Sequence, residues 1–150
     1  MSTRAQVEKS AMEDASLPTQ EDYDAVVRSV KDYAEGWYDG DHERMRRCLH
    51  PDLTKRTIVP GPEPGTWTLR RPITFDRMVD ATKEGGGREV PQLQRRYQID
   101  VLDLFRHIAI ARCVSPQYVD YLHLAKFGDR RWLIVDALWE VRKGALDGGP

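Results

Sequence analysis

The chain has 150 residues, and its 23 lysines and arginines nearly balance 24 aspartates and glutamates, for a formal net charge of −1. This length suits one domain with a substantial core, and the charge balance gives no electrostatic footprint for nucleic acid. Because no apolar run is long enough to span a membrane and no signal-peptide core opens the chain, we expect a cytoplasmic protein that binds neither membrane nor nucleic acid.

The first predicted helix follows a polar leader. Apolar residues recur at helical spacing from Tyr23 to Trp37. Thr19 is a favourable N-cap for this helix, and Gly40 marks its end. Residues 1–20 are rich in small and charged types, and we expect them to form a flexible N-terminal arm.

Two further helices are expected before the sheet. Asp41 can cap a short helix over His42–Leu49, which Pro51 would end. Thr74 can cap a third helix whose apolar residues share one face. The glycine triplet at 85–87 would terminate that helix.

The remaining segments have the composition of strands. Leu53–Val59 is a candidate strand, the Pro- and Gly-rich loop at 60–65 cannot be regular structure, and Trp67–Leu69 is either a short strand or a lid. Near the C-terminus, turn signals separate four segments rich in β-branched and aromatic residues, which predicts an antiparallel meander. These segments are Tyr97–Leu104, Ile108–Val114, Tyr118–Phe127 and Trp132–Val141.

The order of the elements defines the expected architecture. A meander needs cover for its apolar face, and the helices can supply it. We therefore predict an α+β fold, with about three helices packed on a curved and mostly antiparallel sheet. The domain would occupy residues 21–143 and leave a flexible tail at 144–150.

Two stretches resemble the NTF2-like superfamily, which includes the SnoaL-like polyketide cyclases, ketosteroid isomerases and putative lumazine-binding proteins. They read EGWYDGDHERMRRCLHPDLTKR at 35–56 and YVDYLHLAKFGDRRWLIVDALWEVR at 118–142. The resemblance implies a cone-shaped half-barrel with a pocket between helices and concave sheet, and a homodimer formed through the sheet. It implies no single activity, because this fold hosts isomerases, cyclases, dehydratases and non-catalytic binders.

Asp120 is the first candidate for chemistry. It alternates with apolar residues on one strand face. Burying a charged aspartate in such surroundings is costly and readily raises its pKa, which favours the neutral form. Asp120 is either a general base or acid, or a structural carboxylate tied to a neighbouring group. Asp136 occupies a similar row and could complete a two-carboxylate site if the strand register turns both inward.

Two histidines are further candidates. His50 is either a proton shuttle at the pocket mouth, oriented by Asp52, or a cap for the second helix. His123 lies on the strand face opposite Asp120, so only one of the two can face the pocket in a regular strand.

Aromatic residues are expected to line the pocket or to cover it. Tyr33, Trp37 and Trp139 are candidates for the wall, although aromatic stripes at helical spacing also fill ordinary cores. Trp67 lies in the Pro- and Gly-rich region, which suggests a lid or an interface. Lys55 and Arg56 alternate on one strand, and an inward Arg56 would bind a ligand oxygen or neutralise Asp120.

The sequence offers no sign of a bound cofactor. The histidines show no metal-binding spacing, and no glycine-rich loop opens a helix. We therefore expect neither metal nor cofactor. The leading hypothesis is a pocket protein that performs proton transfer on an apolar, carbonyl-bearing substrate, as an isomerase, cyclase or dehydratase. The alternatives are a non-catalytic ligand carrier and a dimeric interaction module.

Overall fold

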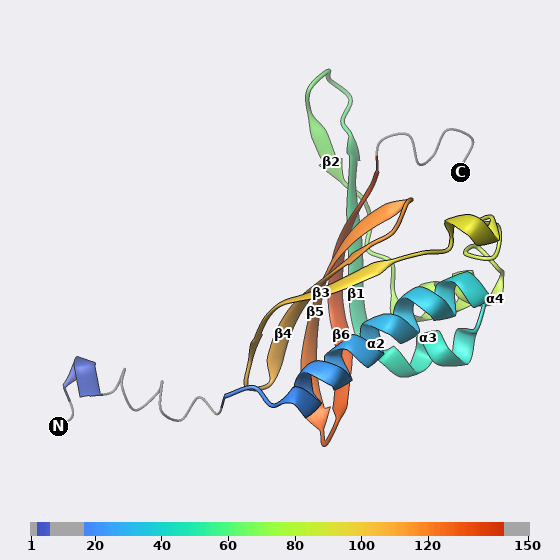
Figure 1. Cartoon of the computed structure of the whole chain (residues 1–150). Coiled ribbons are helices and arrows are strands. Elements are labelled where there is room, and N and C mark those ends of the chain that lie inside the picture. The colour runs from blue at the N-terminus through green and yellow to red at the C-terminus, as the bar shows by residue number, and fades with distance from the viewer. Residues whose placement is uncertain (1–2, 7–16, 143–150) are drawn as a thin grey trace.

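The computed structural model describes residues 3–6 and 17–142, and shows three helices lying against one face of a six-stranded sheet (Figure 1). Most of the expected arm at 1–20, and all of the expected tail at 144–150, lie outside the described residues. Within those residues, no helix is both long and apolar enough to cross a membrane.

Side-chain caps set the start of each helix. The helices that pack on the sheet are α2 (Gln20–Asp39), α3 (His42–Cys48) and α4 (Phe75–Lys83). A short helical segment lies at residues 4–6, and a 3₁₀ turn, η1, lies at Gln92–Gln94. The side chains of Thr19, Asp41 and Thr74 each accept a hydrogen bond from the backbone N–H three residues later, which satisfies a donor that the helix itself leaves free. All three predicted caps are confirmed.

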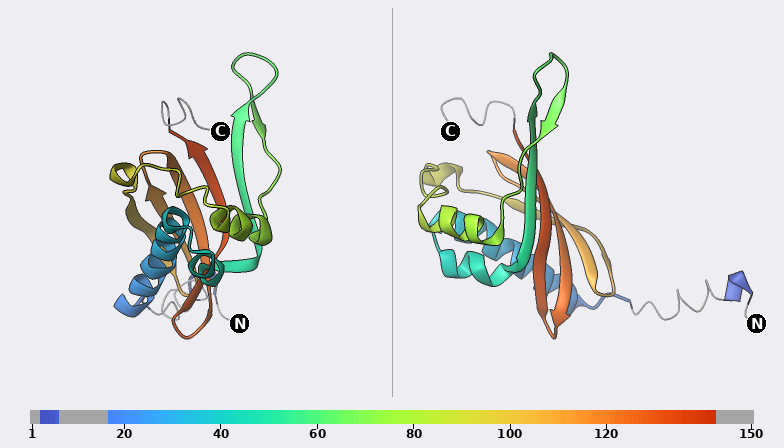
Figure 2. Two further views of the ribbon diagram at one scale, coloured as in Figure 1. Left: turned by 90° about the vertical axis from the view of Figure 1, so that its right-hand side faces the viewer. Right: turned by 180° about the vertical axis from the view of Figure 1, so that it is seen from behind.

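The sheet follows the order β2-β1-β6-β5-β4-β3. Its strands are β1 (Leu49–Pro60), β2 (Trp67–Leu69), β3 (Gln98–Phe105), β4 (Ile108–Val114), β5 (Tyr118–Gly128) and β6 (Arg131–Val141). All neighbours are antiparallel except β1 and β6, which run parallel. The hairpin of β1 and β2 extends beyond the other strands, and the helices cover one face of the curved sheet (Figure 2). The predicted α+β half-barrel is confirmed.

The core lies between the helices and the covered face of the sheet. Side chains from α2, α3 and three strands are almost completely removed from solvent, which supplies the main favourable free energy of folding. The fully buried members include Val26, Val30, Met45, Leu122, Ile134 and Trp132.

An irregularity in β6 decides which side chains face the core. His123 pairs with Asp136, but the next residue of β5, Leu124, pairs with Ile134, so Val135 is an extra residue in β6. Such a β-bulge interrupts the alternation of side chains. Ile134 is therefore buried, whereas Asp136 lies on the exposed face beside His123.

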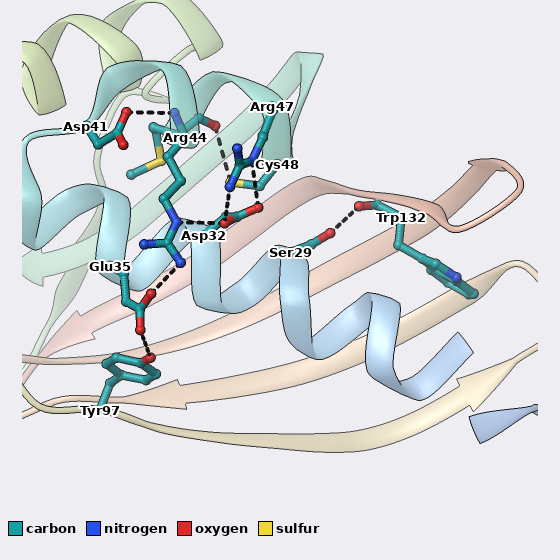
Figure 3. Close-up of polar contacts among 10 residues, drawn as sticks. Ser29, Asp32, Glu35, Asp41, Arg44, Arg47, Cys48, Tyr97 and Trp132 are labelled. Atoms are coloured by element: carbon teal, nitrogen blue, oxygen red, sulfur yellow. Dashed lines mark hydrogen bonds and ion pairs between the residues drawn. The ribbon is translucent and has the colours of Figure 1, made fainter. Parts of the chain in front are cut away.

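A polar network fastens α2 to its neighbours (Figure 3). Asp32 is only 6% exposed and accepts hydrogen bonds of 2.7 Å from Arg44 and 2.9 Å from Arg47, both on α3. Arg44 also pairs with Glu35, which accepts a 2.6 Å hydrogen bond from the hydroxyl of Tyr97. Burial alone would raise the pKa of Asp32, but the two arginines hold it below its usual value. The network fixes the helix that carries much of the site described next.

Candidate functional site

A cavity of about 350 Å³ lies between α2, α4 and the covered face of the sheet. This volume falls in the range of small-molecule pockets, which start at roughly 300 Å³. Most of the exposed surface inside it is apolar, and its polar groups come from residues distant in the sequence. The fold therefore creates a partly enclosed, largely apolar space with a few convergent polar side chains.

A chain of three side chains crosses one wall of this cavity. The amine of Lys55, on β1, donates a 2.6 Å hydrogen bond to the hydroxyl of Tyr33 on α2. That hydroxyl in turn donates a 3.0 Å hydrogen bond to the carboxylate of Asp120 on β5. All three side chains are buried and line the cavity. A base, a phenol and an amine are thus connected within one apolar chamber.

Burial changes the acid–base properties of this chain. It raises the pKa of Asp120, while the nearby Lys55 and the hydrogen bond from Tyr33 partly oppose that shift. It lowers the pKa of Lys55, and the charge of Asp120 acts against that effect. Burial and Asp120 together hold the pKa of Tyr33 well above its usual value, so its hydroxyl stays protonated. Each group is therefore displaced towards its neutral form, as at many sites of proton transfer.

Aromatic rings and a thiol surround the three polar groups. The amine of Lys55 lies 5.0 Å from the ring centroid of Tyr33 and 5.4 Å from that of Trp139. Trp139 also makes an edge-to-face contact with Tyr118, with ring centroids 5.3 Å apart. Cys113 pairs with Asp120 across the strands, and burial followed by that carboxylate raises the pKa of its thiol to about 12. The thiol is thus a small apolar wall group rather than a nucleophile.

The position of Trp37 in the cavity wall depends on the glycines after α4. A β-carbon on Gly87 would lie 2.0 Å from the carbonyl oxygen of Trp37, and one on Gly86 would lie 2.6 Å from its ring. Only glycine allows this close approach of two backbone segments. The triplet at 85–87, predicted only to end a helix, therefore also seats the indole that lines the cavity.

The structure brings four of the residues predicted from the sequence into this cavity. Asp120, Tyr33, Trp37 and Trp139 all line it. Asp120 faces inward, and His123 is half-exposed on the opposite face of β5. The alternation expected between these two residues is present.

Two residues predicted for the site, Asp136 and Arg56, are placed elsewhere by strand register. The bulge at Val135 turns Asp136 to the outer face, where its Oδ1 lies 2.7 Å from Nδ1 of His123. Arg56 is exposed on the outer face of β1, and Lys55 takes the inward position. Both expectations for the pocket are therefore wrong, because the sequence does not fix strand register.

His50 and Trp67 also lie away from the cavity. His50 belongs to β1 rather than to a helix end; its Nδ1 accepts a 3.0 Å hydrogen bond from the backbone N–H of Asp52, and its ring lies 4.8 Å from that of Phe127. It neither caps α3 nor reaches the chamber. Trp67 is 61% exposed in the β1–β2 hairpin and does not line the cavity.

Several lining residues were not identified from the sequence. Lys55 is the most important, and its only signal was the alternation with Arg56. Cys113 and Tyr118 were given no role, because their inward direction depends on pairing between β4 and β5. In residues 3–6 and 17–142, no three His, Cys, Asp or Glu side chains gather in a way that could hold a metal ion.

Comparison with solved structures identifies the fold. An NTF2-like protein of unknown function from Silicibacter pomeroyi superimposes with a TM-score of 0.61 at 14% identity, covering 84% of this chain and 100% of the other. An NTF2-like protein of unknown function from Shewanella baltica gives 0.58 at 16% identity, with 85% and 98% covered. A ketosteroid isomerase-like protein from Erwinia carotovora atroseptica gives 0.51 at 12% identity, with 79% and 92% covered. The chain has the NTF2-like fold.

The sequence match is more specific. A family described as "Putative lumazine-binding" matches residues 21–140, which is most of the chain, and the protein belongs to that family. Comparison with the curated proteins gave no match. The predicted membership of the superfamily, and of this group within it, is confirmed.

Proposed function

We propose that the cavity binds a small, mainly apolar molecule with a carbonyl group, and that the protein transfers a proton on it. The observation that carries this proposal is the buried chain Lys55–Tyr33–Asp120 in the cavity wall. The family description and the isomerase-like structural neighbour are consistent with a small ligand.

Each group has a separate role in this proposal. Asp120 is the base or acid that moves a proton next to the carbonyl, and its raised pKa makes it a stronger base than a solvated aspartate. Tyr33 orients that carboxylate by hydrogen bonding to it. Because the hydroxyl of Tyr33 is already donated, the remaining donors of Lys55 supply the stabilisation of the developing oxyanion.

Deuterium exchange at the carbon next to the carbonyl tests the proposal. Lumazine and a panel of small cyclic and aromatic ketones would be screened for binding by intrinsic fluorescence, and the ligands found incubated with the protein in D₂O and followed by proton NMR. We expect Asp120→Asn to abolish exchange and to retain binding. Asp136→Asn, a matched change on the opposite sheet face, should alter neither.

The outcomes distinguish a catalytic protein from a non-catalytic ligand carrier. Equal exchange in the wild type and in Asp120→Asn would contradict the role of the carboxylate. Binding without exchange for every ligand would instead favour the alternative function, a non-catalytic carrier that uses the same cavity.

We further propose that the protein is a homodimer that buries the outer face of the sheet. Tyr121 and Leu138 pair across β5 and β6 on this face and are 44% and 51% exposed, next to the His123–Asp136 pair. Adjacent exposed apolar side chains of this kind often mark an interface. Sedimentation should show a dimer that Leu138→Glu dissociates; a monomeric wild type would contradict the proposal.

A further inference from the structure

The lysine of the cavity has an environment unlike that of a structural ion pair. Lys55 is 8% exposed, and its amine contacts the hydroxyl of Tyr33 and, at 3.8 Å, the sulfur of Met78. Among the described residues, no carboxylate lies within 4.0 Å of this amine, because Tyr33 is interposed between it and Asp120. A buried lysine without a direct counter-ion is costly to keep charged.

Opposing influences act on the protonation of this amine. Burial is the larger effect and favours the neutral form, whereas Asp120 favours the cation. The faces of Tyr33 and Trp139 also attract a cation, although more weakly than a paired carboxylate would. The net result is a lowered pKa for Lys55, so more of its amine is unprotonated at neutral pH than in a solvated lysine.

We propose that Lys55 is a nucleophile that forms a reversible imine with an aldehyde or ketone bound in the cavity. The inference rests on the proposed function, since it concerns the same cavity and the same substrate class. In this inference Lys55 acts covalently, instead of stabilising an oxyanion as an ammonium group. The nitrogen of the iminium ion would accept the electrons released when a proton leaves the neighbouring carbon.

The side chains around Lys55 suit the steps of imine formation. The amine nitrogen attacks the carbonyl carbon, the C=O π electrons move to oxygen, and the oxygen gains a proton while the nitrogen loses one. The hydroxyl of the carbinolamine then takes a second proton and leaves as water, which gives the iminium ion, and loss of the remaining N–H proton gives the imine. Tyr33 and Asp120 form a continuous path through which these protons can move. Amine plus carbonyl gives imine plus water, so no oxidant or reductant is consumed.

The cavity limits the class of carbonyl compound. Its volume of about 350 Å³ and mostly apolar wall fit a small aromatic or alicyclic aldehyde or ketone. Two exposed arginines, Arg70 and Arg77, also line it, so a compound that carries a carboxylate as well would also be accommodated.

Reductive trapping tests the inference directly. The full-length protein would be incubated at neutral pH with benzaldehyde and sodium cyanoborohydride, which reduces an imine to a stable secondary amine. We expect one adduct with a mass gain of the aldehyde minus one oxygen atom, mapped to Lys55 by peptide mass spectrometry. Lys31 and Lys83, both exposed on helices, serve as internal comparisons. Lys55 should be labelled faster than either, because its lowered pKa leaves more of its amine unprotonated and the cavity holds the aldehyde beside it.

Matched variants separate the inference from the proposed proton transfer. Lys55→Met and Lys55→Arg should each lose the adduct, and the second keeps the positive charge. Asp120→Asn should lose deuterium exchange but still form the adduct at Lys55, more slowly than the wild type, because the proton path is interrupted while the amine remains. Labelling of Lys31 and Lys83 at the same rate as Lys55 in the wild type would overturn the inference, and this readout does not depend on any variant folding. Wild-type exchange without trapping would overturn the imine alone, whereas trapping without exchange would overturn the proton transfer alone.

Discussion

The hydroxyl of Tyr33 donates a 3.0 Å hydrogen bond to Oδ1 of Asp120, joining α2 to β5 across 87 positions of sequence. This bond favours the ionised carboxylate and opposes the effect of burial, which favours the protonated form. The pKa of Asp120 therefore depends on Tyr33, a residue of α2, as well as on the burial of Asp120 in its own strand.

Removing this hydroxyl should raise the pKa of Asp120 further. We expect Tyr33→Phe to shift its titration upwards in carbon-detected NMR of labelled protein, with Asp120→Asn as the assignment control. A carboxyl whose folded pKa is raised loses stability as pH rises from the unfolded to the folded value. The variant should therefore be destabilised by about 1 kcal/mol, and more so at neutral than at acid pH. An unchanged or lower pKa would contradict this account.

The network around Asp32 should govern stability in acid. Its pKa is lowered in the folded state, so its contribution is present above the unfolded value and is lost as pH falls through the folded one. Asp32→Asn should lower the free energy of unfolding by about 1–3 kcal/mol at neutral pH. The difference from the wild type should shrink below about pH 4.

Urea denaturation over a pH series would measure this effect. Asp24→Asn, an exposed aspartate on the same helix, should change stability by no more than about 0.5 kcal/mol. A pH-independent loss in Asp32→Asn would show that packing, rather than charge pairing, explains its effect.

The glycine that approaches Trp37 should not tolerate a side chain. Gly87→Ala places a β-carbon 2.0 Å from a backbone oxygen, and we expect a loss of roughly 1–3 kcal/mol from overpacking. Gly128→Ala is the matched control, since its nearest neighbour would be an ordinary 3.9 Å away. Because Trp37 lines the cavity, Gly87→Ala should also weaken ligand binding. Equal melting temperatures for the two variants would be inconsistent with the close approach.

Tryptophan fluorescence can distinguish the wall of the cavity from the hairpin. Trp37 lines the cavity, whereas Trp67 is exposed in the β1–β2 hairpin. We expect a bound aromatic ligand to quench emission, and Trp37→Phe to remove much of that quenching. Trp67→Phe should leave the ligand-dependent change intact. Loss of the ligand response in Trp67→Phe would indicate that the hairpin acts as a lid, the role considered for it from the sequence.

The elements of this fold could be predicted because their signals are local. Thr19, Asp41 and Thr74 cap their helices through contacts only three residues long. The four C-terminal strands were bounded by turn residues within a residue or two of their observed ends. The start of β1 was missed because Pro51 is expected to end a helix, whereas it lies inside the strand, where the pairing with β6 is irregular between Leu49 and Thr54.

The site was less predictable because it depends on register. Asp120 and Trp139 face inward together. Simple alternation would place Asp136 on the same face as Trp132 and Ile134, but the bulge at Val135 turns it to the opposite face. Likewise, nothing local distinguishes Lys55 from Arg56; the pairing of β1 with β6 decides which one is buried. Long-range pairing of this kind leaves no trace in the patterning of either strand alone.

The parallel pairing of β1 with β6 also bears on how the chain reaches its final state. Strands β3 to β6 are sequential neighbours joined by short turns, whereas β1 must find β6 from the other half of the chain. Pairings with large sequence separation carry a higher loop-closure entropy and slow folding. Lys55 lies on β1, and the carboxylate it faces through Tyr33 lies on β5. The recovery of ligand binding during refolding would therefore measure the pairing of β1 with β6, and not only the formation of the meander of β3 to β6.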